Sequence, residues 1–167
     1  MRIELKLLED INPTQLAMHA NDYQVGLYLR NSFPYPYTLD NALSFINYST
    51  QHNDLNFGIE VDGVCVGCIG ATFHNDIYAH NVEIGYWISS LYWGKGIITY
   101  VVKSMCDYLF VNYPIHKITA EVFSNNIGSC HVLEKNGFIR EGYLKDNAYK
   151  NGKYYDLILY GLRREDL

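Results

Sequence analysis

The sequence lacks the features that mark a membrane protein or a nucleic-acid-binding protein. It carries 13 Lys and Arg against 18 Asp and Glu, a formal net charge of −5, and its basic residues are scattered. Binding to a phosphate backbone needs clustered Lys and Arg, and no apolar run approaches the roughly 18 residues that span a bilayer. Residues 1–6 alternate like a strand instead of opening a signal peptide. We therefore expect no nucleic acid and no membrane among its partners, and a cytoplasmic location.

Cysteine is scarce as well, and no group of residues has the spacing of a metal site. The four cysteines, Cys65, Cys68, Cys106 and Cys130, suit a reducing compartment. Cys65 and Cys68 lie in a strand-like run with no second pair or nearby His, whereas zinc takes about four ligands. We predict a structural role for this pair and no metal. The histidines expected at the surface are His19, His52, His74, His80 and His116.

The chain has only four prolines in 167 residues, and it shows no internal repeat or low-complexity segment. With 49% hydrophobic residues it has the composition of a globular protein. A chain of this length buries about two thirds of its unfolded surface without disulfides or metal. We expect a single domain that spans residues 1–167.

Hydrophobic periodicity predicts a mixed α/β chain with the element order βααβββαβαββ. Alternation with period two predicts strands at residues 2–8, 55–61, 64–73, 81–88, 116–123, 138–144 and 154–162, the last two linked by a polar turn at 150–152. Helical spacing predicts helices at residues 39–50, 96–113 and 126–135, and helical turns within 14–30 that break near Asn21, Asp22 and Gly26.

Turn and cap residues indicate where several of these elements begin and end. Thr38 is a candidate N-cap for the helix that follows it. Asp62 and Gly63 form a two-residue hairpin signal, which predicts that the flanking strands are antiparallel. We also expect Asn136 and Gly137 to supply the left-handed residues that end a helix.

The turn Trp93-Gly94-Lys95-Gly96 follows a predicted strand and opens a long predicted helix. Glycine lets the backbone turn tightly and approach a ligand closely. The first turn of a helix leaves N–H groups unpaired at a positive dipole end. The segment is therefore a candidate cradle for a phosphate or pyrophosphate. A sharp strand-to-helix connection without a ligand is the alternative that the pattern alone leaves open.

Four motifs occur in one register along the chain. They are Glu83-Ile84-Gly85-Tyr86-Trp87-Ile88, Tyr92-Trp93-Gly94-Lys95-Gly96, Asn126-x-x-Ser129 and Glu134-Lys135-x-Gly137-Phe138. This succession resembles the GNAT acetyltransferase superfamily and, within it, the RimJ/RimL type of ribosomal-protein N-terminal acetyltransferases. The resemblance covers essentially the whole chain. It implies the GNAT fold, a mixed, mostly antiparallel, twisted sheet of about seven strands flanked by helices, with a splayed strand pair that holds the cofactor.

The resemblance also implies acyl transfer from acetyl-coenzyme A (acetyl-CoA) to an amine. In the family's Q/R-x-x-G-x-G/A loop, backbone amides hold the pyrophosphate. Here Trp93 replaces the Gln or Arg, and Ile98 stands where Gly or Ala is expected. The pantetheine arm adds to the edge of a splayed strand near Trp87, where one backbone amide can polarise the thioester oxygen. The implied cofactor-binding residues are Trp87, Ile88, Ser89, Trp93, Gly94, Lys95, Gly96, Ile97, Ile98, Thr99, Asn126 and Ser129.

Two carboxylates and a serine are the candidate catalytic residues. Glu121 is the first candidate for the base, because it precedes Asn126 by five residues as the catalytic Glu does in RimI-type enzymes. Glu83 is the second, and either carboxylate can act through water. Many GNAT enzymes protonate the thiolate with a Tyr where this chain has Leu133, so the RimL-like pattern assigns that step to Ser129. The alternatives are a solvated strand carboxylate and a serine that satisfies backbone donors.

The acceptor amine must be neutral to attack. A lysine-like amine with a pKa near 10.4 needs about 4.6 kcal/mol to be neutral at pH 7, whereas a peptide α-amine near 8 needs about 1.4 kcal/mol. A protein or peptide N-terminus is therefore the first prediction. The chain has 16 tyrosines, and aromatic faces can wall an acceptor groove. The candidates are Phe33, Tyr35, Tyr37, Tyr143 and Tyr155, with ordinary packing as the alternative.

Other functions stay open at this point. A polyamine, an amino acid or an aminoglycoside-like compound is an alternative acceptor, and a non-catalytic acyl-CoA-binding module is an alternative class. A Rossmann or P-loop domain matches poorly, because Thr99 replaces the third glycine of Gly-x-Gly-x-x-Gly. Cys130 and His131 are helix neighbours that point about 100° apart, which disfavours a nucleophilic dyad. Strand edges and aromatic surface are compatible with a homodimer.

Overall fold

The structure is a computed structural model that describes residues 1–52 and 55–167. Its backbone forms two compact units. The first unit consists of Met1–Ala71 and Tyr86–Ile97, and the second consists of Thr72–Gly85 and Ile98–Leu167. Within the described ranges we find no helix with the length and apolar character needed to cross a bilayer.

The first unit contains the amino-terminal strands and helices. In chain order they are β1 (Ile3–Leu7), α1 (Pro13–Ala20), α2 (Tyr23–Gly26), α3 (Leu39–Gln51), β2 (Leu55–Val61) and β3 (Val64–Phe73), of which the last two residues belong to the second unit. β2 pairs antiparallel with both β1 and β3. Asp62 and Gly63 have φ angles of 50° and 83°, which confirms the predicted hairpin turn.

Caps and a small apolar core hold the first unit together. Thr38 begins α3 with a capping box in which Thr38 and Asn41 bond each other's backbone N–H groups, as Thr38 was predicted to do. Asn12 caps α1 by accepting from the N–H groups of Thr14 and Gln15. One buried cluster consists of Leu8, Ile11, Leu16, Ala17, Ala20, Tyr37, Ala42, Cys65 and Cys68.

The second unit contains the remaining elements. They are most of β4 (Asn81–Ile88), α4 (Ile97–Asn112), β5 (Lys117–Phe123), α5 (Ile127–Lys135), β6 (Ile139–Lys150) and β7 (Lys153–Arg163). β4 and β5 are parallel, whereas β5 and β6 both pair antiparallel with β7. The residues of α4 with fully buried side chains are Ile97, Val101, Val102, Met105 and Leu109, which recur at helical spacing.

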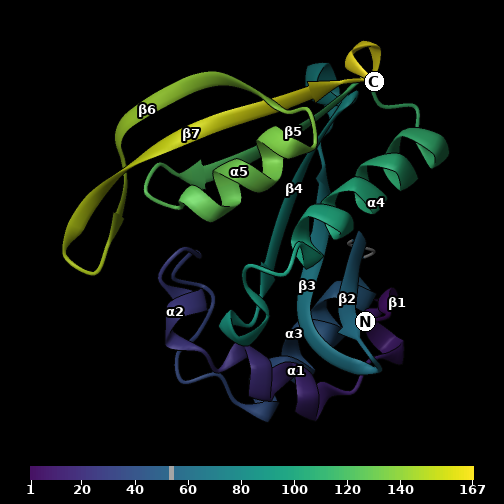
Figure 1. The fold of residues 1–167 in the computed structure, drawn as a ribbon, viewed down its shortest axis with the longest axis vertical. Helices are drawn as coiled ribbons and strands as arrows, with labels where there is room; N and C mark the ends of the chain where they lie inside the picture. Colours follow the sequence, from purple (N-terminus) through teal and green to yellow (C-terminus); the bar gives the residue numbers. More distant parts are fainter. Residues whose placement is uncertain (53–54) are drawn as a thin grey trace. The chain divides into compact units, whose positions relative to one another are not determined.

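The strands described here form one open seven-stranded sheet in the order β1-β2-β3-β4-β5-β7-β6 (Figure 1). Only the β4–β5 pair among the recorded ladders is parallel, so the sheet is mixed and mostly antiparallel, with helices flanking it. The predicted fold class is confirmed.

Three predictions differ from the structure in detail. β6 continues past Leu144 to Lys150, because a register shift with Asp146 at φ 51° carries the polar residues 145–147 within the strand. Gly137 ends α5 with φ 85°, but Asn136 has φ −92° and is not left-handed. His19 is only 8% exposed, so its predicted surface position is wrong, whereas the other four predicted surface histidines are exposed.

Candidate functional site

The loop between β4 and α4 has the conformation that an anion cradle needs. Gly94 and Gly96 have φ angles of 72° and 74°, in the left-handed region that residues with a side chain rarely adopt. A Cβ atom added to either glycine would meet no heavy atom within 4 Å. These positions therefore require glycine for their backbone conformation and not for packing, and the space beside both is open.

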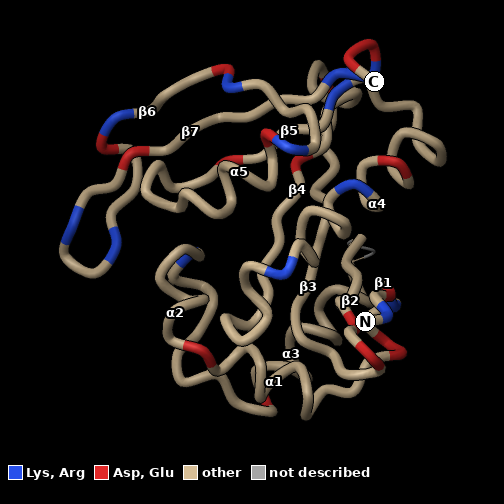
Figure 2. Tube along the Cα trace, in the orientation of Figure 1, with Lys and Arg blue, Asp and Glu red and all other residues tan. Residues whose placement is uncertain are grey.

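The charge around this loop also favours an anion. Lys95 is the only charged residue between Glu83 and Lys103, so the tube in Figure 2 stays uncharged on both sides of it. The first turn of α4 contains no acidic residue, and α4 is 16 residues long. Its unpaired N–H groups and positive dipole end therefore face no internal carboxylate from their own helix.

Side chains around the loop are used to fix its backbone. The indole Nε1–H of Trp93 donates to the carbonyl oxygen of Ile88 at 3.0 Å. The Lys95 ammonium lies 5.0 Å from the centroid of the Tyr92 ring, within the range of a cation–π contact. Ile97, where α4 begins, is 1% exposed and anchors the loop in the apolar interior.

The end of β4 lies unusually close to β3. A Cβ atom on Gly67 would be 2.3 Å from the carbonyl oxygen of Trp87, so only glycine permits this approach. The Ser89 N–H donates to the carbonyl oxygen of Val66 at 2.9 Å, and Ser89 is 2% exposed. Of the three predicted pantetheine contacts, the Ser89 amide is thus already bonded within the chain, and the Ile88 carbonyl already accepts one hydrogen bond.

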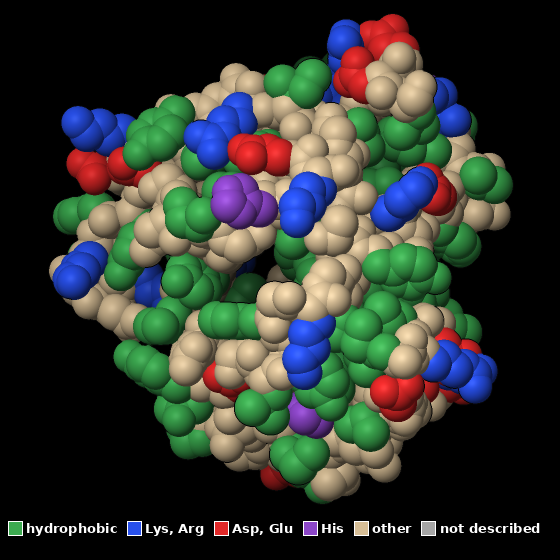
Figure 3. All heavy atoms as spheres, in the orientation of Figure 1, with side chains coloured by type: hydrophobic (Ala, Val, Ile, Leu, Met, Phe, Trp, Pro, Cys, Tyr) green, Lys and Arg blue, Asp and Glu red, His purple; other side chains and the backbone are tan. Residues whose placement is uncertain are grey.

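Three of the predicted acceptor residues lie in the first unit, and they differ in exposure. Phe33 contacts Tyr37 and Trp87, with ring centroids 5.0 and 5.4 Å apart, so Phe33 joins the core to the end of β4. Tyr37 is 7% exposed and belongs to that core. Tyr35 is 57% exposed and packs edge-on against Tyr23 at 5.4 Å. Hydrophobic side chains are at the surface over α2 (Figure 3).

In the second unit, β4 and β5 pair only at their beginnings. The recorded parallel ladder joins Asn81–Glu83 to Lys117–Thr119, whereas the antiparallel ladder between β5 and β7 continues to Phe123. Glu83 therefore lies at the last recorded rung, and Glu121 lies beyond it. Glu121 is exposed and its neighbour across the β7 ladder is Leu159. This short ladder agrees with the predicted divergence of the two strands.

Asn126 and Ser129 meet at the start of α5, as their spacing predicted. The Asn126 side-chain oxygen accepts from the Ser129 N–H at 3.3 Å, which makes Asn126 the N-cap. Ser129 is partly buried. Cys130 is 2% exposed, whereas its neighbour His131 is exposed, so the two side chains lie in different environments. Leu133 is fully buried and belongs to the core side of the helix.

Polar contacts fix the C-terminal end of α5. The Tyr160 hydroxyl donates to Glu134 at 2.9 Å, and the Arg140 guanidinium donates to the same oxygen at 3.0 Å. The hydrogen bond from Tyr160, followed by that from Arg140, holds the pKa of Glu134 below its usual value. The Asn136 amide donates to the carbonyl oxygen of Thr99 at 3.2 Å, which joins the end of α5 to the first turn of α4.

The two predicted acceptor residues of the second unit are engaged in local contacts. The Tyr143 hydroxyl donates to Asp156, which also accepts from the Asp146 N–H at 2.7 Å. The hydrogen bond from Tyr143, followed by the one from Asp146, lowers the pKa of Asp156. Tyr155 packs against Phe123 at the end of β5, with ring centroids 5.3 Å apart.

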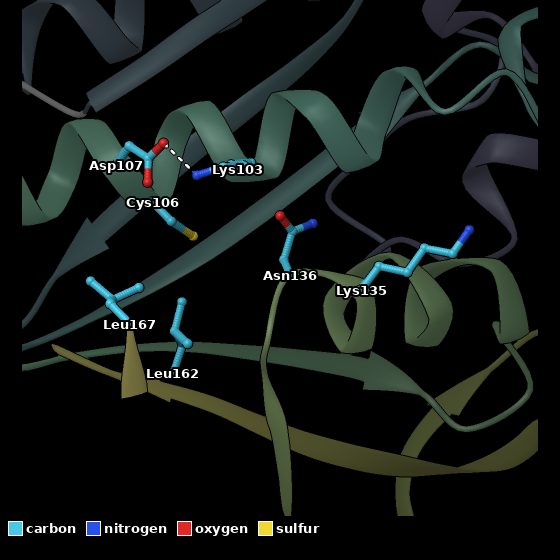
Figure 4. A pocket seen from close by; sticks show the side chains of 7 residues that line it. All are labelled: Lys103, Cys106, Asp107, Lys135, Asn136, Leu162 and Leu167. Carbon is cyan, nitrogen blue, oxygen red and sulfur yellow. Dashed lines mark hydrogen bonds and ion pairs between the residues drawn. The ribbon is translucent and has the colours of Figure 1, made fainter. Parts of the chain in front are cut away.

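A pocket of about 170 Å³ lies in the second unit, and none of its lining residues is a predicted site residue (Figure 4). It is lined by Lys103, Cys106, Asp107, Lys135, Asn136, Leu162 and Leu167. At its rim Lys103 and Asp107 form an ion pair at 2.8 Å. Burial raises the pKa of the Cys106 thiol to about 12, so this cysteine stays protonated. The pocket offers no reactive group to the chemistry predicted from the motifs.

All four cysteines are buried free thiols. Burial raises the pKa of Cys65 to about 11 and that of Cys68 well above its usual value, so both are poor metal ligands and poor nucleophiles at neutral pH. Among residues 1–52 and 55–167, no three His, Cys, Asp or Glu side chains are grouped as a metal site would require.

Comparison with known proteins gives the class of protein. A model of the acetyltransferase (GNAT) domain family matches residues 2–139. The putative ribosomal N-acetyltransferase YdaF of Bacillus subtilis (strain 168) is 32% identical over 173 residues, which cover 98% of this chain and 92% of YdaF. The chain therefore belongs to the GNAT acetyltransferase family, whose members are acyltransferases.

Two solved structures show the same fold at lower identity. Mycobacterium smegmatis RimJ in complex with CoA-disulfide aligns with a TM-score of 0.83 at 24% identity, covering 99% of this chain and 82% of that one. Spermidine N-acetyltransferase from Vibrio cholerae in complex with CoA and spermine aligns with a TM-score of 0.82 at 24% identity, covering 98% and 96%. These two structures show the fold, and the relationship to YdaF, a putative ribosomal N-acetyltransferase, confirms that the chain is RimJ/RimL-like within its family.

Proposed function

We propose that this protein is an acetyl-CoA-dependent N-acetyltransferase whose acceptor is the N-terminal α-amine of a protein or peptide. The observation that carries the proposal is the loop at Gly94–Gly96, with two open left-handed glycines ahead of a long helix whose first turn has no acidic residue. Because the family model runs through residues of both units, we propose that residues 1–167 act as one acetyltransferase domain.

The residues present match the chemistry of coenzyme A. Backbone N–H groups from Gly94 to Thr99 suit a pyrophosphate, since an anion at a helix start is stabilised by unpaired donors and by the helix dipole. Trp93 holds the strand end that precedes them through its bond to Ile88. Ile98 is only partly buried and leaves the backbone donors in place, so its departure from the family pattern is compatible with binding. When bound, acetyl-CoA supplies the acetyl group as a reactive thioester.

The catalytic roles follow from the side chains around β5 and α5. We propose that Glu121 takes the proton of the acceptor amine, directly or through water, because it is an exposed carboxylate just beyond the β4–β5 ladder. Glu83 is the second candidate for this role. Ser129 donates a proton to the departing thiolate, and Asn126 orients Ser129 by accepting from its N–H group. No metal enters this scheme.

The acceptor assignment rests on the amine's own chemistry. Neutralising an α-amine at pH 7 needs about 1.4 kcal/mol, against about 4.6 kcal/mol for a lysine-like amine, so one carboxylate acting through water is sufficient help. A polyamine is the second candidate acceptor. It is supported by the net charge of −5, which attracts a polycation, and by the likeness to a spermidine N-acetyltransferase.

Binding and turnover assays test the proposal separately. We expect acetyl-CoA and CoA, but not NAD or ATP, to raise the melting temperature, and if neither coenzyme does so the assignment fails. Thiol release from acetyl-CoA is then measured with N-terminal peptides, polyamines and aminoglycosides. Fast release with peptides supports the proposed acceptor, and fast release with spermidine alone replaces it. Tight CoA binding without release for any amine would leave a non-catalytic acyl-CoA-binding module.

A further inference from the structure

Asp22 joins two segments that are far apart in the sequence. Its Oδ2 atom accepts a hydrogen bond from the Ser90 N–H at 2.8 Å, across 68 positions of the chain. Its Oδ1 atom accepts from the Gln24 N–H at 3.1 Å and so caps α2. Ser90 is the first residue of a short 3-10 turn, Ser90–Tyr92, and Gly94 follows two residues after this turn. Asp22 thereby fixes the backbone at the entrance to the glycine loop.

The preceding residue, Asn21, makes the corresponding contact to the aromatic segment. Its side-chain oxygen accepts from the Tyr37 N–H at 2.9 Å. Its own N–H donates to the carbonyl oxygen of Ala17 at 3.0 Å, so the end of α1 holds Asn21 in place. Tyr37 contacts Phe33, and Phe33 contacts Trp87 at the end of β4. Adjacent residues thus hold the aromatic segment and the glycine loop.

A second set of contacts reaches the same loop from α1. The ring of His19, on the last turn of α1, meets the Tyr92 ring edge-on with centroids 5.7 Å apart. Tyr92 also contacts Lys95, whose ammonium lies 5.0 Å from the centroid of the Tyr92 ring. The segment at the end of α1 therefore contacts the loop in two ways. His19 packs against the Tyr92 side chain, and Asp22 accepts a hydrogen bond from the Ser90 backbone.

Ionisation strengthens the contact at Asp22. Burial opposes ionisation of this carboxyl, but hydrogen bonds from the N–H group and the side chain of Ser90, and from the N–H groups of Gln24 and Val25, together outweigh it and hold the pKa of Asp22 below its usual value. Asp22 is consequently an anion at neutral pH. A hydrogen bond from a backbone N–H to a carboxylate is stronger than one to a neutral oxygen.

We propose that Asn21 and Asp22 form a positioning bracket, in which Asp22 presets the cofactor loop, Asn21 presets the aromatic segment, and acetyl-CoA affinity and acceptor affinity are coupled through these two residues. The proposal rests on the proposed function, because it takes Gly94–Gly96 as the pyrophosphate loop and the Phe33–Tyr37 segment as part of the acceptor site. Neither residue of the bracket touches a substrate. Both act by holding backbone whose freedom would otherwise be lost on binding.

The variant Asp22→Ser separates the bracket from helix capping. Serine is a good N-cap and keeps an acceptor for the Gln24 N–H, but its single short oxygen cannot also reach Ser90. We expect the dissociation constant for CoA to rise about tenfold, because a hydrogen bond to a charged group that preorders the site is lost. Amide hydrogen exchange without any ligand is expected to accelerate over residues 90–97.

Asn12→Ala is the matched control, since Asn12 caps the start of α1 in the same unit by accepting from the N–H groups of Thr14 and Gln15. It is expected to lower the melting temperature by about 2–4 °C while leaving CoA affinity within about twofold and exchange over residues 90–97 unchanged. A merely structural role for Asp22 would make the two variants alike in affinity and in exchange, and that result would overturn the proposal.

Asn21 tests the coupling. Asn21→Ala is expected to raise KM for the acceptor about tenfold and to weaken the increase in acceptor affinity that CoA causes in the wild type, whereas Asn21→Asp keeps the acceptor oxygen and restores both. Unchanged acceptor KM in Asn21→Ala would remove the coupling. If the wild type binds no CoA, the proposed function fails, but amide hydrogen exchange without ligand still tests the positioning role of Asp22. Faster exchange over residues 90–97 in Asp22→Ser than in Asn12→Ala supports that role, and equal exchange overturns it.

Discussion

The proposed cofactor loop at residues 89–97 in the first unit and the segment from Glu121 to Ser129 in the second unit would offer a ligand different kinds of chemical group. In the loop, the groups offered to a ligand are backbone N–H donors, and the side chains of Trp93 and Tyr92 are engaged in holding that backbone. In the β5–α5 segment, the backbone is regular strand and helix, and the candidate groups are side chains. One region depends on conformation and the other on residue identity.

This difference predicts how each region responds to substitution. A conservative change that keeps the side-chain shape at Glu121 should slow the chemistry strongly and leave the fold unchanged, because Glu121 is exposed. A change that adds a single methyl group should damage the loop, because Gly94 and Gly96 are left-handed. The predictions below test this comparison, beginning with the largest expected effect.

Glu121→Gln removes the proposed base and keeps the side-chain size. We expect kcat/KM with a peptide acceptor at pH 7 to fall about 100-fold, the lower end for loss of a general base. The loss should shrink as the pH rises past the amine pKa near 8, because the neutral amine then forms without help. Initial rates of thiol release measured from about pH 6.5 to about pH 9 give this profile.

Two other carboxylates serve as references for Glu121. Glu83→Gln tests the second candidate, and a larger loss there than in Glu121→Gln would exchange the two roles. Glu60→Gln changes a strand carboxylate in the first unit that has no proposed role and should leave the rates unchanged. A pH-independent loss in Glu121→Gln would show that the residue is structural.

Gly96→Ala tests the loop, with Gly152→Ala as a control of nearly the same backbone conformation. The φ angles are 74° and 76°, and a Cβ atom meets nothing within 4 Å at either site. The strain of about 1–2 kcal/mol should therefore lower both melting temperatures by about 2–8 °C. Only Gly96→Ala should weaken CoA binding, by about 5- to 30-fold, as the loop relaxes away from its preset conformation.

Calorimetric titration with CoA and a thermal melt of each variant measure these two effects. If both variants bind CoA like the wild type, the loop is a connection between β4 and α4 and not a binding element. If both weaken binding equally, the loss comes from general destabilisation.

Ser129→Ala should have a smaller effect than either change. A thiol has a pKa near 8.5, so its thiolate is a weakly basic leaving group that departs with little help from an acid, and we expect kcat to fall about three- to tenfold. Asn126 bonds the Ser129 N–H, which alanine retains, so α5 should stay capped and KM for acetyl-CoA should change little. A raised KM with unchanged kcat would assign Ser129 to binding.

The sequence predicts those parts of the molecule whose cause is local. Thr38, Asp62 and Gly63 act through neighbours two or three positions away, and the structure places each as its residue type indicates. Asn126, Gly94 and Gly96 likewise act on the backbone of their own segment, as a helix cap and as left-handed turn residues. The extension of β6 past Leu144 was missed because the polar residues 145–147 interrupt the alternation on which the strand prediction depends.

The missed features depend on contacts between distant parts of the chain. Asn21 and Asp22 were interpreted only as a break between helices, whereas their side chains bond residues 16 and 68 positions away. An Asn-Asp pair at a helix break is a signal for capping, and capping of α2 was thus within reach of the sequence. The contact between Asp22 and Ser90 could not be predicted from the sequence, because no local pattern specifies which distant loop a carboxylate contacts.

His19 belongs to the contacts that hold the loop, and it gives the smallest predicted effect. Burial lowers its pKa, and the nearby carboxylate of Asp22 only partly opposes this. The unfolded chain therefore binds the proton more readily, and this contribution to stability is present above the unfolded pKa near 6.5 and is lost as the pH falls below it. The melting temperature of the wild type should therefore rise from acidic to neutral pH on this account, and His19→Gln should flatten the rise. His74→Gln, a change at an exposed histidine, should leave the slope as it is. Equal slopes of melting temperature against pH in all three proteins would contradict this prediction. They would show that the His19–Tyr92 contact holds the loop equally well when the His19 ring is charged.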